Sequence, residues 1–136
     1  MINPISRSLF QSAALALLLA AGCSNNPSVE SFTPPKDTAR DALTAALDAW
    51  QNGQAKPGEI EDVTPTVQMN DPRWTKGAKL KSYEIVEELP GDSPRKFSVK
   101  LTLEGEAAPA EITYVVVGKK PLWVMPESEY DRGAGM

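Results

Sequence analysis

Apolar positions recur every three to four residues between residues 36 and 52, which is the spacing of one face of an α-helix. Asp37 can cap the start of this helix, and Gly53 is placed to end it in a left-handed conformation. Three large side chains and four alanines share the apolar face: Leu43, Leu47, Trp50, Ala39, Ala42, Ala46 and Ala49. The pattern predicts a helix whose apolar face is buried in the core.

Apolar and polar residues alternate over residues 96–104, which predicts a strand with one buried and one solvated face. Residues 112–117 are apolar at nearly every position, as is typical of a central strand. Shorter patterns predict strands over residues 66–69, 80–89 and 122–125. Prolines around the first of these indicate an edge strand, whereas residues 71–74 are typical of a turn.

This order of elements predicts an α+β fold with one N-terminal helix packed on a curved antiparallel sheet of four or five strands. The order, together with the stretch "EITYVVVGKKPLWV" at residues 111–124, resembles the cystatin-like roll and its nuclear-transport-factor-like branch. The resemblance implies a helix lying across the sheet. We expect a single domain over residues 36–126, followed by a loose polar tail at residues 127–136.

The N-terminal segment combines Arg7, an apolar run over residues 9–21 and small residues at its exit. Positive charge, apolar middle and small exit residues form the secretory signal pattern. The run is shorter than the roughly 20 apolar residues that a membrane-spanning helix needs. We therefore expect residues 1–22 to be a removed signal peptide, and we expect no permanent transmembrane helix.

The exit of this segment reads Leu-Ala-Ala-Gly-Cys at residues 19–23 and resembles the lipobox of bacterial lipoproteins. The resemblance implies cleavage between Gly22 and Cys23, a diacylglycerol on the Cys23 thiol and an acylated new amino terminus. Cys23 is the only cysteine, and an acyl acceptor explains it better than an unpaired thiol in an exported protein. Ser24, in place of aspartate, implies sorting to the outer membrane in the best-known rule of the family.

A lipid at Cys23 would hold the protein on the periplasm-facing side of the cell envelope, with the membrane as a partner. Residues 23–35 are rich in polar residues and proline, and predict a semi-extended tether. Downstream, the pattern W-x2-G-x2-L-x2-YEI at residues 74–85 resembles small uncharacterised exported lipoproteins. That likeness implies no specific role.

Charge and composition narrow the classes of function. Removal of residues 1–22 takes away only the charge of Arg7, so the net charge changes from −4 to −5. An acidic chain argues against nucleic acid as a partner. The chain contains no histidine, which excludes Ser-His-Asp triads, Cys-His pairs and histidine metal ligands.

Acidic clusters at residues 59–62, 87–88 and 127–129 leave a carboxylate pair or a weak calcium site chemically possible. Solvated surface charge is the simpler interpretation of all three clusters. We therefore predict no catalytic residue, no metal ligand and no cofactor.

Two kinds of non-catalytic function remain open. Val86, Val115 and Val117 alternate away from the predicted helix-facing side of the sheet and would form an apolar patch. An envelope protein or a second copy of the chain would cover that patch; alternatively the tether, the final strand or the tail of the same chain folds over it. If an envelope protein or a second copy covers the patch, the domain is a structural or adaptor module.

The alternative is a small-ligand pocket between helix and sheet. Four aromatic residues are candidates to line it: Trp50, Trp74, Tyr83 and Trp123. The same residues would serve equally as core side chains, because aromatic rings supply large buried surfaces.

Overall fold

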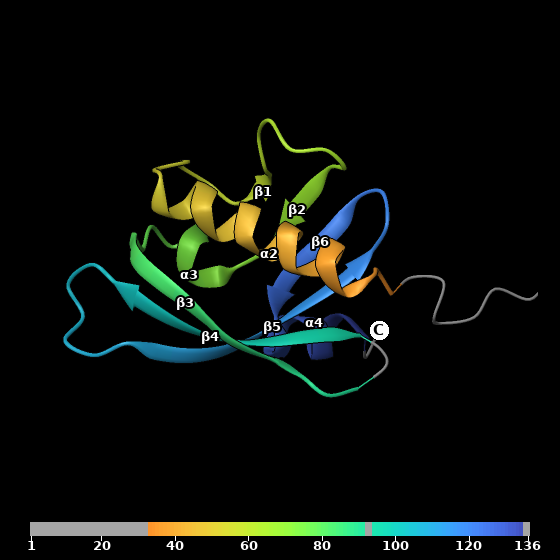
Figure 1. Cartoon of the computed structure of the whole chain (residues 1–136). Coiled ribbons are helices and arrows are strands. Elements are labelled where there is room, and N and C mark those ends of the chain that lie inside the picture. The colour runs from red at the N-terminus through yellow and green to blue at the C-terminus, as the bar shows by residue number, and fades with distance from the viewer. Residues whose placement is uncertain (1–32, 92–93, 135–136) are drawn as a thin grey trace, which may run out of the picture.

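The structure is a computed structural model that describes residues 33–91 and 94–134 (Figure 1). The signal peptide, Cys23 and most of the expected tether lie outside the described residues, so the predictions for them stay predictions. The described elements are α2 (Lys36–Gln51), β1 (Gly58–Glu59), β2 (Val67–Met69), α3 (Pro72–Thr75), β3 (Leu80–Leu89), β4 (Arg95–Leu103), β5 (Ala110–Gly118), β6 (Leu122–Pro126) and α4 (Glu127–Ala134).

The described strands form one six-stranded sheet in the order β1-β2-β6-β5-β4-β3. The α+β class is as predicted. The expected antiparallel sheet of four or five strands with one helix is wrong in detail, because β2 pairs parallel to β6 and the described residues contain six strands and three helices. β2 also lies inside the sheet rather than at its edge, since β1 covers its other side.

Helix α2 lies across one face of the sheet (Figure 1). Its predicted apolar face is buried except at Ala49, which is partly buried. Alternate residues of β4, β5 and β6 supply the buried side chains of the sheet: Phe97, Val99, Leu101, Tyr114, Val116, Leu122 and Val124. The alternation predicted for residues 96–104 is thus confirmed, and burial of these faces stabilises the domain.

The two ends of α2 are built differently. Pro35 is the N-cap residue and no side chain caps the helix, so the predicted cap by Asp37 is wrong. Asp37 lies in the first turn instead, where a carboxylate suits the helix dipole. At the other end Gly53 adopts φ +99°, the left-handed conformation that the sequence led us to expect.

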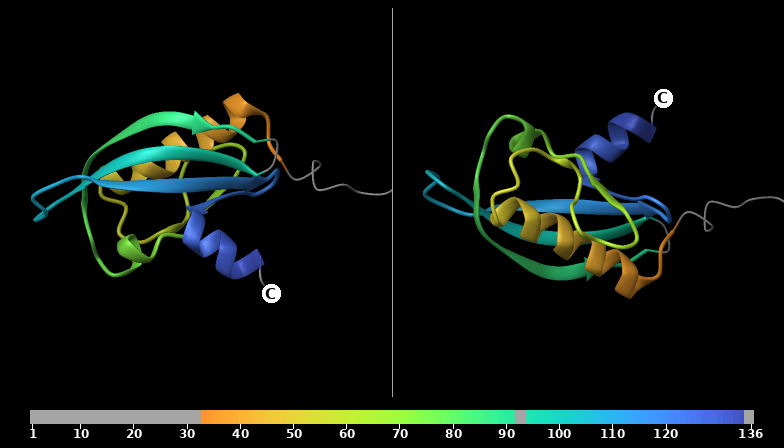
Figure 2. Two further views of the ribbon diagram at one scale, coloured as in Figure 1. Left: turned by 90° about the horizontal axis from the view of Figure 1, so that it is seen from below. Right: turned by 90° about the horizontal axis from the view of Figure 1, so that it is seen from above.

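Helix α4 replaces the loose tail that we expected after residue 126. It packs against β5 and β6 on the side of the sheet opposite α2 (Figure 2). Lys96 Nζ lies 2.6 Å from Glu127 Oε2 and ties the start of α4 to β4. Val115 faces this side and is fully buried, whereas Val86 on edge strand β3 is 44% exposed. The chain's own C-terminal segment therefore covers part of the second apolar face.

Candidate functional site

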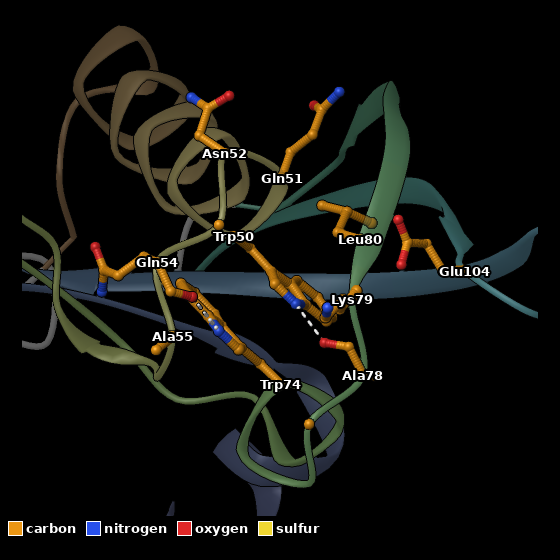
Figure 3. Close-up of a pocket in the computed structure, with 12 residues that line it drawn as sticks. Trp50, Gln51, Asn52, Gln54, Ala55, Trp74, Ala78, Lys79, Leu80 and Glu104 are labelled. Carbon is orange, nitrogen blue, oxygen red and sulfur yellow. Dashed lines mark hydrogen bonds between the residues drawn. The ribbon is translucent and has the colours of Figure 1, made fainter.

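A depression of about 340 Å³ lies beyond the C-terminal end of α2 (Figure 3). Trp50 and Trp74 line its floor. The polar side chains around it come from the end of α2, the following loop and the ends of β3 and β4: Gln51, Asn52, Gln54, Lys79 and Glu104. It combines two aromatic rings with several polar side chains, and it is the candidate site.

The two tryptophans stack with ring centroids 5.4 Å apart and ring planes 6° apart. Trp50 and Trp74 are only 3% and 2% exposed. Each indole N–H is used within the fold, because Trp50 Nε1 donates to Ala78 O at 2.8 Å and Trp74 Nε1 donates to Gln54 O at 3.0 Å. The stack therefore closes the end of the core beneath the depression.

The amides at the rim also bind their own backbone. Gln54 Nε2 donates to Lys56 O at 2.9 Å and to Glu59 O at 3.3 Å. Gln51 Nε2 donates to Lys81 O at 3.2 Å and joins the end of α2 to β3. These bonds hold the rim in place, and they leave Lys79 and Glu104 as its exposed charged side chains.

The four candidate aromatic residues do not share one pocket. Tyr83 lies between β3 and α2, where its hydroxyl donates to Asp48 Oδ1 at 2.5 Å. Burial, followed by this hydrogen bond and the Asp48 charge, raises the pKa of Tyr83. Trp123 lies on the face of the sheet away from α2 and is 42% exposed. Its outward position follows from strand alternation, because Leu122 and Val124 on either side point into the core.

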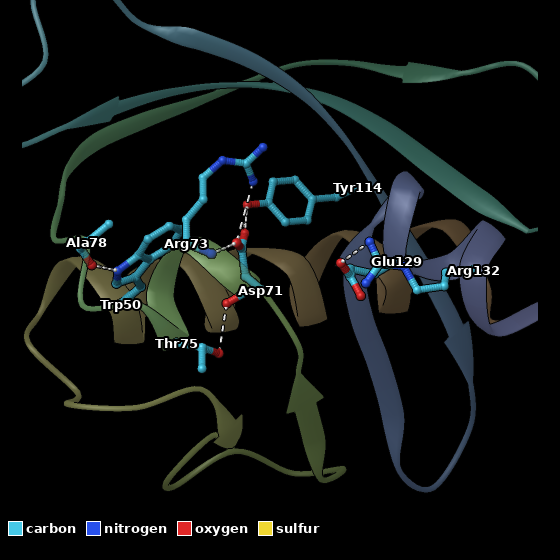
Figure 4. A network of polar contacts seen from close by, with 8 residues as sticks. All are labelled: Trp50, Asp71, Arg73, Thr75, Ala78, Tyr114, Glu129 and Arg132. Atoms are coloured by element: carbon cyan, nitrogen blue, oxygen red, sulfur yellow. Dashed lines mark hydrogen bonds and ion pairs between the residues drawn. The ribbon is translucent and has the colours of Figure 1, made fainter.

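Sequence reasoning missed a buried ionisable pair (Figure 4). Tyr114 Oη donates to Asp71 Oδ2 at 2.5 Å, and both side chains are fully buried. Asp71 Oδ1 accepts from Arg73 N at 2.9 Å and so caps the one-turn helix α3, where we expected a simple turn. Burial first, and then the charge of Asp71, raises the pKa of Tyr114 well above its usual value.

The acidic clusters remain at the surface in the part of the chain that the structure describes. Glu127 pairs with Lys96, and Glu129 pairs with Arg132 at 3.5 Å. Within residues 33–91 and 94–134, no three carboxylate, cysteine or histidine side chains gather closely enough to hold a metal ion. In the same ranges, no helix is both long and apolar enough to cross a membrane.

Comparisons with known protein families, with curated proteins and with solved structures find no match for this chain. Two features of the described residues bear on function: the depression beyond α2, and the point where the chain enters the domain.

The Asp71–Tyr114 pair generates a stability prediction. Tyr114→Phe removes a hydrogen bond to a buried carboxylate and should lower the free energy of unfolding at neutral pH by about 1.5–3 kcal/mol. The pKa of the hydroxyl is raised in the folded state, so its contribution is complete below the unfolded value near 10 and declines as the pH rises above it. The difference between wild type and Tyr114→Phe should therefore narrow at alkaline pH.

Urea unfolding at pH 7 and at pH 10.5 measures both effects, with Tyr130→Phe in α4 as the matched control. The control should unfold close to wild type at pH 7, because Tyr130 lies outside the buried pair. A Tyr114→Phe variant as stable as wild type at pH 7, or a gap that widens with pH, would contradict the role assigned to the pair.

Proposed function

We propose that the chain is a lipoprotein anchored to a membrane of the bacterial cell envelope, where its domain acts without catalysis as a structural or adaptor module. The signal pattern at residues 1–22 and the lipobox ending at Cys23 support the anchor. Each buried methylene of an acyl chain contributes about 0.8 kcal/mol, so several chains hold a protein firmly. Ser24 favours the outer membrane as the destination.

The observation that carries the proposal is where the chain enters the domain. Pro34 O accepts a hydrogen bond from Arg95 Nε at 3.0 Å, next to the first turn of α2. The depression lies past the other end of this 16-residue helix, which corresponds to a separation of roughly 24 Å along the axis at 1.5 Å per residue. An anchor at Cys23 would therefore attach the domain at the end opposite the depression.

The buried chemistry supports a non-catalytic role. The Tyr114 hydroxyl donates to Asp71, whose carboxylate also caps α3, so both side chains have structural partners. The indole N–H groups of Trp50 and Trp74 donate to backbone carbonyl oxygens and are therefore also used within the fold. All four side chains act as links between elements that are distant in the sequence.

Small-ligand binding is the second candidate function, and the shape of the depression favours it. About 340 Å³ lies within the usual range for ligand sites. A ligand would contact Lys79, Glu104 and the rim amides more than the indole faces, because the stack buries those faces. We also propose that α2 and strands β3 to β6 form a cystatin-like roll, which the helix lying across the sheet supports.

The anchor is tested at Cys23. Cys23→Ala, or treatment with globomycin, should move the protein from the membrane fraction to the soluble fraction and change its electrophoretic mobility. Mass spectrometry of the natural product should show a diacylglycerol-modified cysteine at the new amino terminus. An intact Met1 or an unmodified thiol at residue 23 would overturn the anchor.

The adaptor role is tested by photo-crosslinking in native envelopes. A crosslinkable residue at Asn52, beside the depression, should give discrete adducts with envelope proteins, whereas one at Lys119, near the tether, should give fewer. A thermal-shift screen with lipids, glycans and peptidoglycan fragments examines the alternative. A shift with one of these, together with no protein adduct at Asn52, would replace the adaptor by a ligand-binding domain.

A further inference from the structure

Trp123 is a large apolar side chain that the described fold leaves uncovered. It is 42% exposed and lies at the start of β6, directly opposite Val117 of β5. Its ring lies over the end of the β5–β6 turn, since Trp123 Cδ1 is 3.6 Å from the position that a Cβ on Gly118 would take. Helix α4 shields Val115 on the same face but leaves Trp123 accessible.

Two lysines lie in the turn that leads into Trp123. Lys119 and Lys120 form the tip of the turn, and both are exposed. Neither makes an ion pair with any residue that the structure describes. An exposed indole on the same hairpin as two exposed lysines suits the membrane–water interface, where tryptophan sits at headgroup level and lysine binds phosphate.

The turn also lies at the end of the domain where the chain enters. Arg95, which binds Pro34 O, pairs in the sheet with Val116, two residues before Gly118. On the other side, Leu122 lines a small recess together with Thr38 of the first turns of α2. The views of the ribbon agree, because the β5–β6 turn and the start of α2 lie together (Figures 1 and 2).

We propose that Trp123, Lys119 and Lys120 dock on the anionic phospholipid headgroups of the leaflet that holds the lipid anchor. The docking rests on the proposed anchor at Cys23. Thr33 lies ten positions after Cys23, and a chain of that length spans at most about 35 Å when fully extended. The tether thus keeps the turn within reach of the bilayer and holds the local concentration of headgroups high.

Charge favours the bilayer over a second copy of the chain. Two copies meeting at this turn would bring the lysine pairs together, and like charges repel. Two acidic side chains at the same end are placed by their contacts. Asp41 of α2 lines the recess that Leu122 also lines, and Glu88 pairs with Arg95 at 3.8 Å. With a net charge of −5 after signal removal, the lysine turn is the part of this surface best suited to face an anionic bilayer.

Tryptophan quenching by brominated lipids tests the docking on the full mature lipoprotein. The protein is reconstituted into phosphatidylethanolamine–phosphatidylglycerol vesicles with plain or brominated acyl chains. Trp50 and Trp74 are buried in the core, so Trp123 is the indole that the bromine atoms can reach. We expect weaker emission in brominated vesicles, and we expect Trp123→Phe to abolish the difference.

Charge variants separate docking from anchoring. The double change Lys119→Glu and Lys120→Glu should reduce the quenching while the protein still floats with the vesicles. The matched control Lys79→Glu, at the depression, should leave the quenching as in wild type. If the anchored protein gives equal emission in plain and brominated vesicles, the docking is overturned and the anchor stands. This holds whether or not acrylamide in the water quenches Trp123. Protein that carries no lipid and does not float overturns the anchor, and the docking with it.

Discussion

The packing of α2 against the apolar face of the sheet fixes which features of the domain lie at its two opposite ends. The alanines at 39, 42 and 46 are buried and bring the helix close to the sheet, where Phe97, Tyr114 and Val116 fill the space. One end of the helix then stands beside the entering chain and the β5–β6 turn, and the other stands over the Trp50–Trp74 stack. The proposed membrane contact and the proposed partner contact belong to these opposite ends.

Local periodicity was enough to predict the central part of this fold. The helix over residues 36–52 and the strand over residues 96–104 carry long, regular apolar patterns, and both are present within a residue of the expected bounds. The parallel pairing of β2 with β6 could not be predicted, because β2 has three residues and its partner strand begins 53 residues after its last residue. Helix α4 was missed since its short sequence is mostly polar and its few contacts depend on Val115 and the surrounding sheet.

The candidate site shows the same division between local and long-range information. Trp123 was expected in a pocket between helix and sheet, but it lies on the outer face, because Leu122 and Val124 on either side are buried. The Trp50–Trp74 stack and the Asp71–Tyr114 hydrogen bond join residues 24 and 43 positions apart, and no pattern in the sequence records such pairings. The sequence does carry a local sign for Asp71, because an Asp followed by a Pro is typical of the start of a helix. It gives no indication that Tyr114 is the partner of Asp71.

The distance of each end of the domain from the bilayer tests the central claim most directly. A donor dye on Lys119→Cys or on Asn52→Cys, in the mature lipoprotein on vesicles that contain acceptor lipids, reports that distance by energy transfer. We predict clearly higher transfer from residue 119, because α2 separates the two ends by roughly 24 Å. Equal transfer from both positions, or higher transfer from residue 52, would contradict the orientation on which both proposals rest.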